Sequence, residues 1–99
     1  MKLVRDKIPE IILKQGRTCS YRYADEKEFK KLLVDKLQEE TKEYVENNNP
    51  EELADIIEVI KALAEQHNIR IDQLELTRKK KAEERGAFTK RIVLEKWEN

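Results

Sequence analysis

Apolar side chains recur at helical spacing in two segments of the chain, residues 26–46 and the stretch that follows Pro50. When each residue of the first segment is advanced by about 100°, the apolar side chains fall within one arc of roughly 140°. They are Phe29, Leu32, Leu33, Leu37 and Tyr44. The apolar face of the second segment consists of Leu53, Ile56, Ile57, Ile60, Leu63 and Ala64. This pattern predicts two amphipathic helices, joined by an Asn-Asn-Asn-Pro break that is typical of a tight turn.

Capping residues set the expected ends of these two helices. Asp25 followed by Glu28 has the pattern of a capping box, in which side chains accept the free N–H groups of the first turn, and it predicts a first helix over residues 26–46. Asn49 is expected to cap the second helix, with Pro50 at the first position, where its missing N–H would be unpaired anyway. The second helix is expected to end at the His-Asn pair that follows its last apolar residues.

A short helix is expected near the amino end of the chain. Pro9 suits a first helical turn and Gly16 suits a stop, so the sequence predicts a helix over residues 8–14. Residues 17–23 are aromatic and weakly alternating, which fits either a short strand or an extended loop.

A third long helix is expected near the carboxyl end. Asp72 and Glu75 repeat the capping-box pattern and predict a helix over residues 73–85 that ends at Gly86. Its apolar stripe is weak and its remaining face is basic. Residues 91–97 then fit either a final strand or an arm that lies over a partner subunit.

Together these elements predict an all-α fold in a single domain spanning residues 1–99. Charged residues make up 42% of the chain and hydrophobic residues 38%, with only two Gly and two Pro, which favours amphipathic helices over a β-sandwich. We expect an antiparallel helical bundle with the basic helix beside the two long ones and with short extended ends. A domain of this size buries little core by itself, so we expect oligomerisation to complete the core.

Charge is separated along the chain although the formal net charge is zero. Between residues 35 and 58, nine acidic side chains stand against two basic ones, and between residues 78 and 91, seven basic side chains stand against two acidic ones. Zero net charge gives no reason to expect binding to a nucleic-acid polymer. The two blocks either neutralise each other or divide the tasks of holding a metal and a polyanion.

Cys19 is the only cysteine, so an intramolecular disulfide is excluded and a reducing, cytoplasmic compartment is expected. The apolar run near the amino end is interrupted by Pro9 and by charges. It is too short to cross a membrane, and we expect neither a signal peptide nor a membrane partner.

Acidic side chains on the apolar arc carry the strongest chemical signal. Glu40 and Glu43 fall inside the arc of the first long helix, where an unpaired carboxylate is costly. Glu52 and Asp55 border the apolar face of the second, although Glu52 also fits a capping-box partner. Antiparallel helices would bring these four acids together, and hard oxygen ligands suit Mg²⁺, with Mn²⁺ as an alternative. An internally salt-bridged bundle is the competing interpretation.

These acids form an ExxE motif followed by an ExxD motif, which resembles the signature of the MazG-like nucleotide pyrophosphohydrolases, the all-α NTP pyrophosphatase superfamily. The opening LVRDKIP of residues 3–9 and the closing RGAFxxRI of residues 85–92 resemble the ends of a subgroup described as phosphoribosyl-ATP pyrophosphohydrolase-like. The resemblance therefore extends over nearly the whole chain.

The resemblance implies Mg²⁺-dependent hydrolysis of a nucleoside triphosphate, or a phosphoribosyl-ATP-like nucleotide, to the monophosphate and pyrophosphate, as in the removal of noncanonical nucleotides. It implies a homodimer or homotetramer. The residues that it assigns to the metal are Glu40, Glu43, Glu52 and Asp55. Either Glu39 or Glu40 is implied to orient or deprotonate the attacking water. The basic positions implied to contact phosphate are Arg5, Lys7, Lys81 and Arg85.

Two departures from the family pattern stand out. Only eight residues separate Glu43 from Glu52, a shorter gap than is usual, and Ala87 stands where the subgroup commonly has a second Gly. The alternative function is a non-catalytic helical module that binds a nucleotide or a protein through its charged faces. A regulatory binder related to phage or toxin systems belongs to the same alternative.

Overall fold

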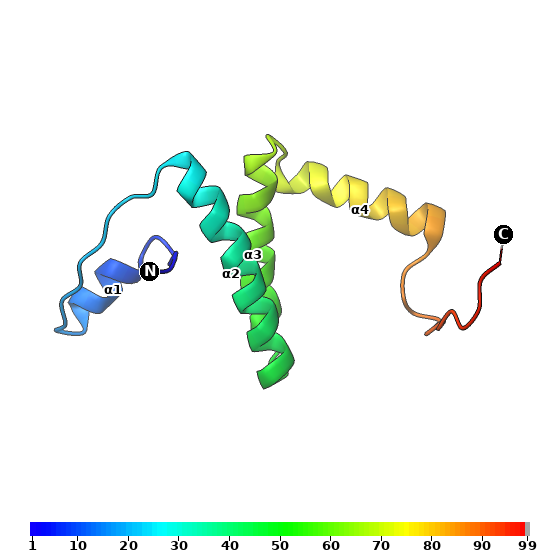
Figure 1. Ribbon diagram of the computed structural model, residues 1–99, viewed down its shortest axis with the longest axis horizontal. Helices are drawn as coiled ribbons and strands as arrows, with labels where there is room; N and C mark the ends of the chain where they lie inside the picture. The colour runs from blue at the N-terminus through cyan, green and yellow to red at the C-terminus, as the bar shows by residue number, and fades with distance from the viewer. Residues whose placement is uncertain (99) are drawn as a thin grey trace.

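A computed structural model describes residues 1–98 of the chain, and over that range its helices are joined by non-helical segments, with no strand. Figure 1 shows its four helices: α1 (Ile8–Lys14), α2 (Glu26–Asn47), α3 (Glu51–Gln66) and α4 (Ile71–Arg85). The predicted all-α class is confirmed, and α1 has its predicted bounds. Within residues 1–98, none of these helices combines the length and the apolar content that crossing a membrane requires.

The centre of the fold is an antiparallel hairpin of α2 and α3 (Figure 1). Leu33 of α2 packs at the interface and is only 2% exposed, while Val59 and Ala64 are the buried apolar residues of α3. Leu33 and Ala64 belong to the predicted apolar faces, whereas Val59 lies on the side of α3 that carries Glu52 and Asp55. Burial of this narrow interface is what holds the two helices together.

The turn between α2 and α3 is short because its asparagines take special conformations. Asn48 ends α2 in the left-handed region, with φ of 51°, and its N–H donates to the carbonyl of Tyr44 at 2.8 Å. Asparagine tolerates this conformation better than most side chains. Asn49 Oδ1 then accepts the N–H of Glu51 at 3.0 Å. The helix α3 begins at Glu51 with Pro50 at its N-cap position, so Asn49 lies one residue before the cap and not at it as predicted.

Of two predicted capping boxes, the one at the start of α2 is partly formed and the one at the start of α4 is wrong. Asp25 accepts the N–H of Glu28 at 2.9 Å as expected, but the Glu28 carboxylate pairs with Arg22 at 2.6 Å instead of returning to the cap. At the start of α4, Gln73 Oε1 accepts the N–H of Arg70 at 2.9 Å. Because Arg70 and Gln73 form the cap in place of the predicted Asp72 and Glu75, the helix begins at residue 71, two residues before the predicted start.

The helix α4 leaves the hairpin instead of lying beside it. Figure 1 shows α4 extending away from the end of α3, on the side opposite α1, with the carboxyl-terminal segment beyond it. The apolar stripe of α4 is weak, so this helix gains little by packing against the hairpin. Within α4 only Leu74 and Ala82 are half-buried. Residues 17–23 and 91–97 are extended and form no strand.

The chain by itself exposes far more surface than a compact protein of its size. Its accessible area is 9469 Å², whereas a compact monomer of this mass has roughly 5,900 Å². Its radius of gyration is 17.9 Å, against about 13 Å for a compact domain of this length. Leu53 and Ile57, predicted to be on the core face, are 43% and 59% exposed. That prediction is wrong within one chain, because α2 covers only part of the apolar face of α3.

We predict that Leu33→Ala strongly destabilises the fold. Leu33 is the most deeply buried apolar side chain among the core residues, and truncating such a residue costs about 2–5 kcal/mol. Urea unfolding followed by circular dichroism measures the change. Leu13→Ala is the control, because Leu13 is 68% exposed and should cost less than about 0.5 kcal/mol. Equal effects of the two substitutions would contradict this account of the core.

Candidate metal centre

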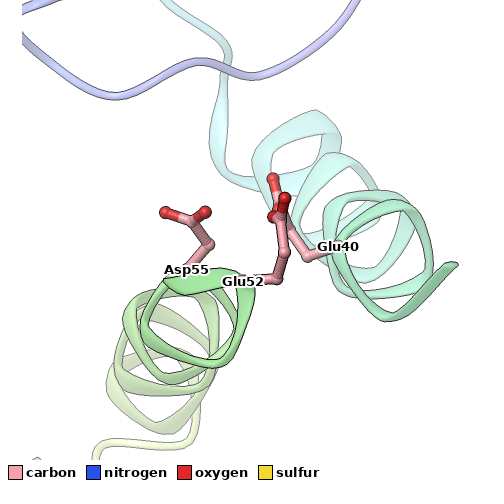
Figure 2. A group of neighbouring side chains, drawn as sticks. All are labelled: Glu40, Glu52 and Asp55. Carbon is pink, nitrogen blue, oxygen red and sulfur yellow. The ribbon is translucent and has the colours of Figure 1, made fainter. Parts of the chain in front are cut away.

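Three carboxylates from α2 and α3 converge at the hairpin interface (Figure 2). Glu40, Glu52 and Asp55 each offer one oxygen, and these oxygens lie within 4.8 Å of one another. Glu52 and Asp55 share one side of α3 because they are three residues apart. Glu40 faces them because it lies on the stripe of α2 that packs against α3. Three of the four acids predicted as metal ligands are thus brought together.

Glu40 is the buried member of this group. Only 7% of its surface is exposed, and its Oε2 atom is buried without a hydrogen-bond partner. Its other oxygen, Oε1, pairs with Lys36 Nζ at 3.3 Å. Burial raises the pKa of the Glu40 carboxyl above its ordinary value of 4.5, and Glu43 raises it further against the pull of Lys36. A buried acceptor with no partner is costly, so this oxygen is suited to receive a ligand.

Glu43 lies outside the group of three. It is half-buried one helical turn beyond Glu40 on the same side of α2, and it raises the pKa of Glu40. Glu52 is half-buried within the group, and its backbone N–H donates to the Asn49 carbonyl at 3.0 Å, but no described hydrogen bond joins its carboxylate to the N–H of Asn49, as a capping box requires. Among the described contacts, the position of Glu52 therefore fits the ligand interpretation and not the capping-box one.

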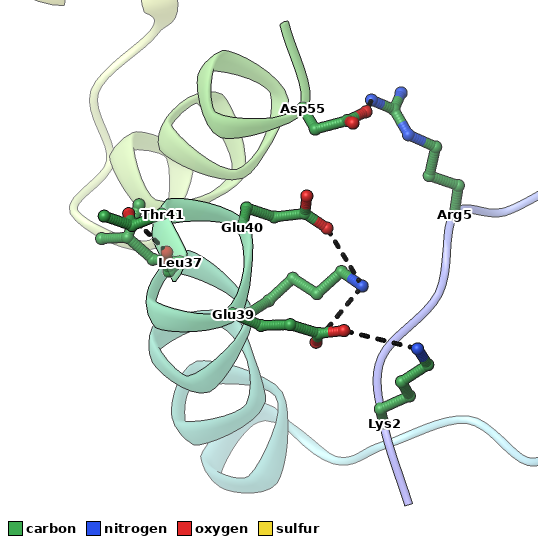
Figure 3. Close-up of polar contacts among 8 residues, drawn as sticks. Lys2, Arg5, Leu37, Glu39, Glu40, Thr41 and Asp55 are labelled. Carbon is green, nitrogen blue, oxygen red and sulfur yellow. Dashed lines mark hydrogen bonds and ion pairs between the residues drawn. The ribbon is translucent and has the colours of Figure 1, made fainter. Parts of the chain in front are cut away.

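Glu39 faces a different environment from its neighbour Glu40. Its Oε1 atom lies 3.3 Å from Lys2 Nζ, and its Oε2 atom lies 3.5 Å from Lys36 Nζ (Figure 3). Partial burial opposes ionisation of Glu39, but Lys36 and Lys2 outweigh it and lower the pKa of this carboxyl. The two adjacent acids therefore have pKa values shifted in opposite directions. Glu39 stays ionised and paired, while Glu40 keeps a free oxygen.

The amino-terminal segment, residues 1–7, crosses the face of the acidic group. Arg5 Nη2 donates to Asp55 Oδ1 at 2.6 Å, which joins this segment directly to the carboxylates (Figure 3). Hydrophobic periodicity cannot reveal this contact, because residues 1–7 form no helix. Lys2 was not among the predicted site residues, because no local pattern in the sequence points to its contact with Glu39.

An open groove of about 710 Å³ lies between the amino-terminal segment, α1, α2 and α3. One part of its lining is apolar and includes Leu3, Ile8, Phe29, Leu33 and Val59. The polar part includes the charged residues Arg5, Lys7, Lys36, Glu40 and Asp55. The groove therefore offers an apolar wall next to basic and acidic groups, the combination that accommodates a base and a phosphate chain.

The predicted phosphate-binding residues fall into two separate groups. Arg5 and Lys7 line the groove beside the acidic group. Lys81 and Arg85 are exposed in the last turns of α4, which projects away from the hairpin (Figure 1). A single chain therefore does not bring all four basic side chains to the carboxylates.

The arrangement fits a hard divalent cation on chemical grounds. Three carboxylate oxygens on two helices provide the donor type that Mg²⁺ and Mn²⁺ prefer. The unpartnered Oε2 atom of Glu40 gives a reason, beyond the acidic residues alone, for a ligand at this position. Comparisons of the chain with models of protein families, with curated proteins and with solved structures gave no match.

We predict that Glu40→Gln stabilises the metal-free protein at neutral pH. The pKa of Glu40 is raised in the folded state, so the folded protein holds this proton at pH values where the unfolded chain has released it. Stability therefore falls as pH rises through the window just above 4.5, and Gln removes this loss. Thermal unfolding in EDTA between pH 4 and 7 should show an advantage of Glu40→Gln that grows with pH and reaches about 2–8 °C.

Glu46→Gln is the matched control for this experiment. Glu46 lies on the same helix, but its side chain is 60% exposed and its only described ion pair is to Lys42 at 4.0 Å. Such pairs contribute little, so the melting temperature should change by less than about 2 °C. A Glu40→Gln variant that is less stable than the parent at pH 7 without metal would contradict the prediction. It would show that Lys36 already compensates the buried charge of Glu40.

Proposed function

We propose that this chain is a Mg²⁺-dependent nucleotide pyrophosphohydrolase of the MazG-like type. The observation that supports this proposal most directly is that Glu40, one of three carboxylates that converge, has a buried oxygen without a hydrogen-bond partner. The ExxE and ExxD motifs, whose acids include these three, agree with it. The products are a nucleoside monophosphate and pyrophosphate.

Each group around the site has a role in this proposal. Glu40, Glu52 and Asp55 hold the metal, and Glu43 supports it from the next turn of α2. When bound, Mg²⁺ neutralises the phosphate chain and stabilises the charge that develops as the P–O bond breaks. Glu40 is the better proton acceptor for the attacking water, because burial raises its pKa, whereas Lys36 and Lys2 lower the pKa of Glu39. Glu39 positions Lys36 beside Glu40.

The groove supports a nucleotide as the substrate class. Its apolar wall suits a base, and Arg5 and Lys7 line the polar part, where a phosphate chain would lie next to the carboxylates. The competing function, a helical module that binds without catalysis, predicts instead that neutralising the acids leaves binding intact. The two functions are separated by whether pyrophosphate is released.

We predict that pyrophosphate release requires Mg²⁺ or Mn²⁺ and depends on the carboxylates of α3. The assay is a panel of canonical and modified nucleoside triphosphates and phosphoribosyl-ATP, with and without metal. Glu52→Gln and Asp55→Asn should each reduce the rate by more than about 100-fold, since even residues behind metal ligands contribute about 10- to 100-fold.

Glu51→Gln is the control, because Glu51 is exposed, adjacent to Glu52 and outside the acidic group. It should retain the activity of the parent. A folded parent protein that releases no pyrophosphate from any of these nucleotides, and binds no Mg²⁺ by calorimetry, would exclude the enzymatic function. Nucleotide binding under those conditions would favour the non-catalytic module.

We also propose that the chain works as a homo-oligomer, a dimer or a tetramer. The surface of a single chain exceeds that of a compact monomer by roughly 3,500 Å², which is more than the roughly 1,000–2,500 Å² that each partner commonly loses in an obligate interface. Leu53 and Ile57 form an exposed apolar stripe on α3. Phe88 and Trp97 are exposed apolar side chains of the carboxyl-terminal segment. In this proposal the stripe packs against a second copy and residues 86–98 form an arm over it.

We predict that sedimentation velocity gives a mass of at least twice 11.8 kDa and that Ile57→Asp lowers it toward the monomer. A charge placed on a buried apolar face is costly, so assembly should weaken by more than about 100-fold. Lys27→Asp, which introduces the same side chain at an exposed position of α2, is the control. Trp97 is the only tryptophan, and its emission should shift to the red in Ile57→Asp. A monomeric parent chain would refute the proposal.

A further inference from the structure

One basic side chain is bonded directly to the carboxylates proposed to hold the metal. Arg5 Nη2 lies 2.6 Å from Asp55 Oδ1, and Asp55 offers an oxygen to the group that also contains Glu40 and Glu52. Lys2 and Lys36 contact other oxygens nearby, on Glu39 and Glu40. Arg5 is thus the only basic residue among the described ion pairs to contact the α3 part of the group.

A guanidinium at this position has the same electrostatic task as a metal ion. Three carboxylates within 4.8 Å repel one another unless positive charge is placed among them. Arg5 supplies one positive charge to Asp55 from the side of the groove. A divalent cation bound by Asp55 would supply two charges at the same place, and it would repel the guanidinium and compete for the same carboxylate.

The segment that carries Arg5 is suited to release it. Residues 1–7 form no helix, and the Arg5 side chain is 54% exposed, so the guanidinium is accessible from the solvent. Arg5 and Lys7 both line the groove whose polar part adjoins the carboxylates. A small change in side-chain torsions moves the guanidinium from Asp55 to an anion in the groove, where it can make two parallel hydrogen bonds to a phosphate.

We propose that Arg5 is a displaceable counter-ion: it neutralises Asp55 while the site lacks metal, and it transfers to the phosphate chain of the nucleotide when the metal binds. This inference rests on the proposed function and adds a coupling to it. Metal binding frees Arg5 for the phosphate, and phosphate binding removes Arg5 from competition with the metal. By linkage, each ligand therefore strengthens the binding of the other.

The proposal requires that one substitution change the two affinities in opposite directions. In Arg5→Gln the metal no longer displaces an ion pair, so its binding should tighten. Exposed pairs contribute about 0.2–1 kcal/mol, which corresponds to an increase in metal affinity of up to about fivefold. The phosphate chain loses a charge-assisted contact, so its affinity should fall by at least about tenfold. A residue that serves only stability would shift both affinities in the same direction or neither.

The test uses binding measurements on the full chain, without reliance on turnover. Mn²⁺ affinity is measured by calorimetry in the absence of phosphate, and tripolyphosphate affinity is measured at saturating Mg²⁺. Lys2→Gln is the matched control, because Lys2 lies on the same segment but pairs with Glu39, outside the group of three. It should change Mn²⁺ affinity by less than about 1.5-fold, and thermal melts show that both variants fold.

Tighter Mn²⁺ binding with weaker tripolyphosphate binding in Arg5→Gln supports the exchange. If the parent binds both ligands but Arg5→Gln leaves Mn²⁺ affinity unchanged or weaker, the counter-ion role of Arg5 is wrong while the proposed function stands. If Mn²⁺ binding tightens and tripolyphosphate affinity is unchanged, the transfer to phosphate is wrong. A parent chain that binds no metal overturns the proposed function and this inference together.

Discussion

The structure depends on a carboxylate that shares a helix interface with apolar side chains. Glu40 lies two helical turns from Leu33 on the same stripe of α2, so the packing that buries Leu33 also withdraws Glu40 from water. Withdrawing the acid costs free energy. Lys36 limits that cost by contacting one oxygen of Glu40, whereas the nearby carboxylates of Glu52 and Asp55 add to it by repulsion. Packing and site chemistry are therefore determined by the same few residues.

Helical phase explains what could be predicted from the sequence. A period of about 3.6 residues places Glu40 on the stripe of Leu33, and it places Asp55 one turn from Glu52. Asp25 caps the start of α2, and Asn49 accepts the first N–H of α3 from the turn before it. These features act within a few residues along the chain, so local pattern is sufficient to predict the hairpin and most of its acidic group.

The rest of the structure depends on contacts that local pattern does not record. The ion pair of Arg5 with Asp55 joins residues fifty positions apart, through a segment without periodicity. Phase identified Leu53 and Ile57 as members of an apolar face, but it does not say which neighbour covers that face. The direction of α4 is set by a connection of a few residues and by few apolar contacts, so its predicted place beside the hairpin was wrong.

The tight turn at Asn48 and Asn49 has a consequence for how the length of this hairpin can vary in evolution. Each residue inserted into a helix rotates everything beyond it by about 100°, so a single insertion between the two acidic motifs would turn one set of carboxylates away from the other. Adding one full turn to each helix restores the facing arrangement and keeps the turn on the same side. Related hairpins that preserve both motifs should therefore differ in length by steps of about seven residues.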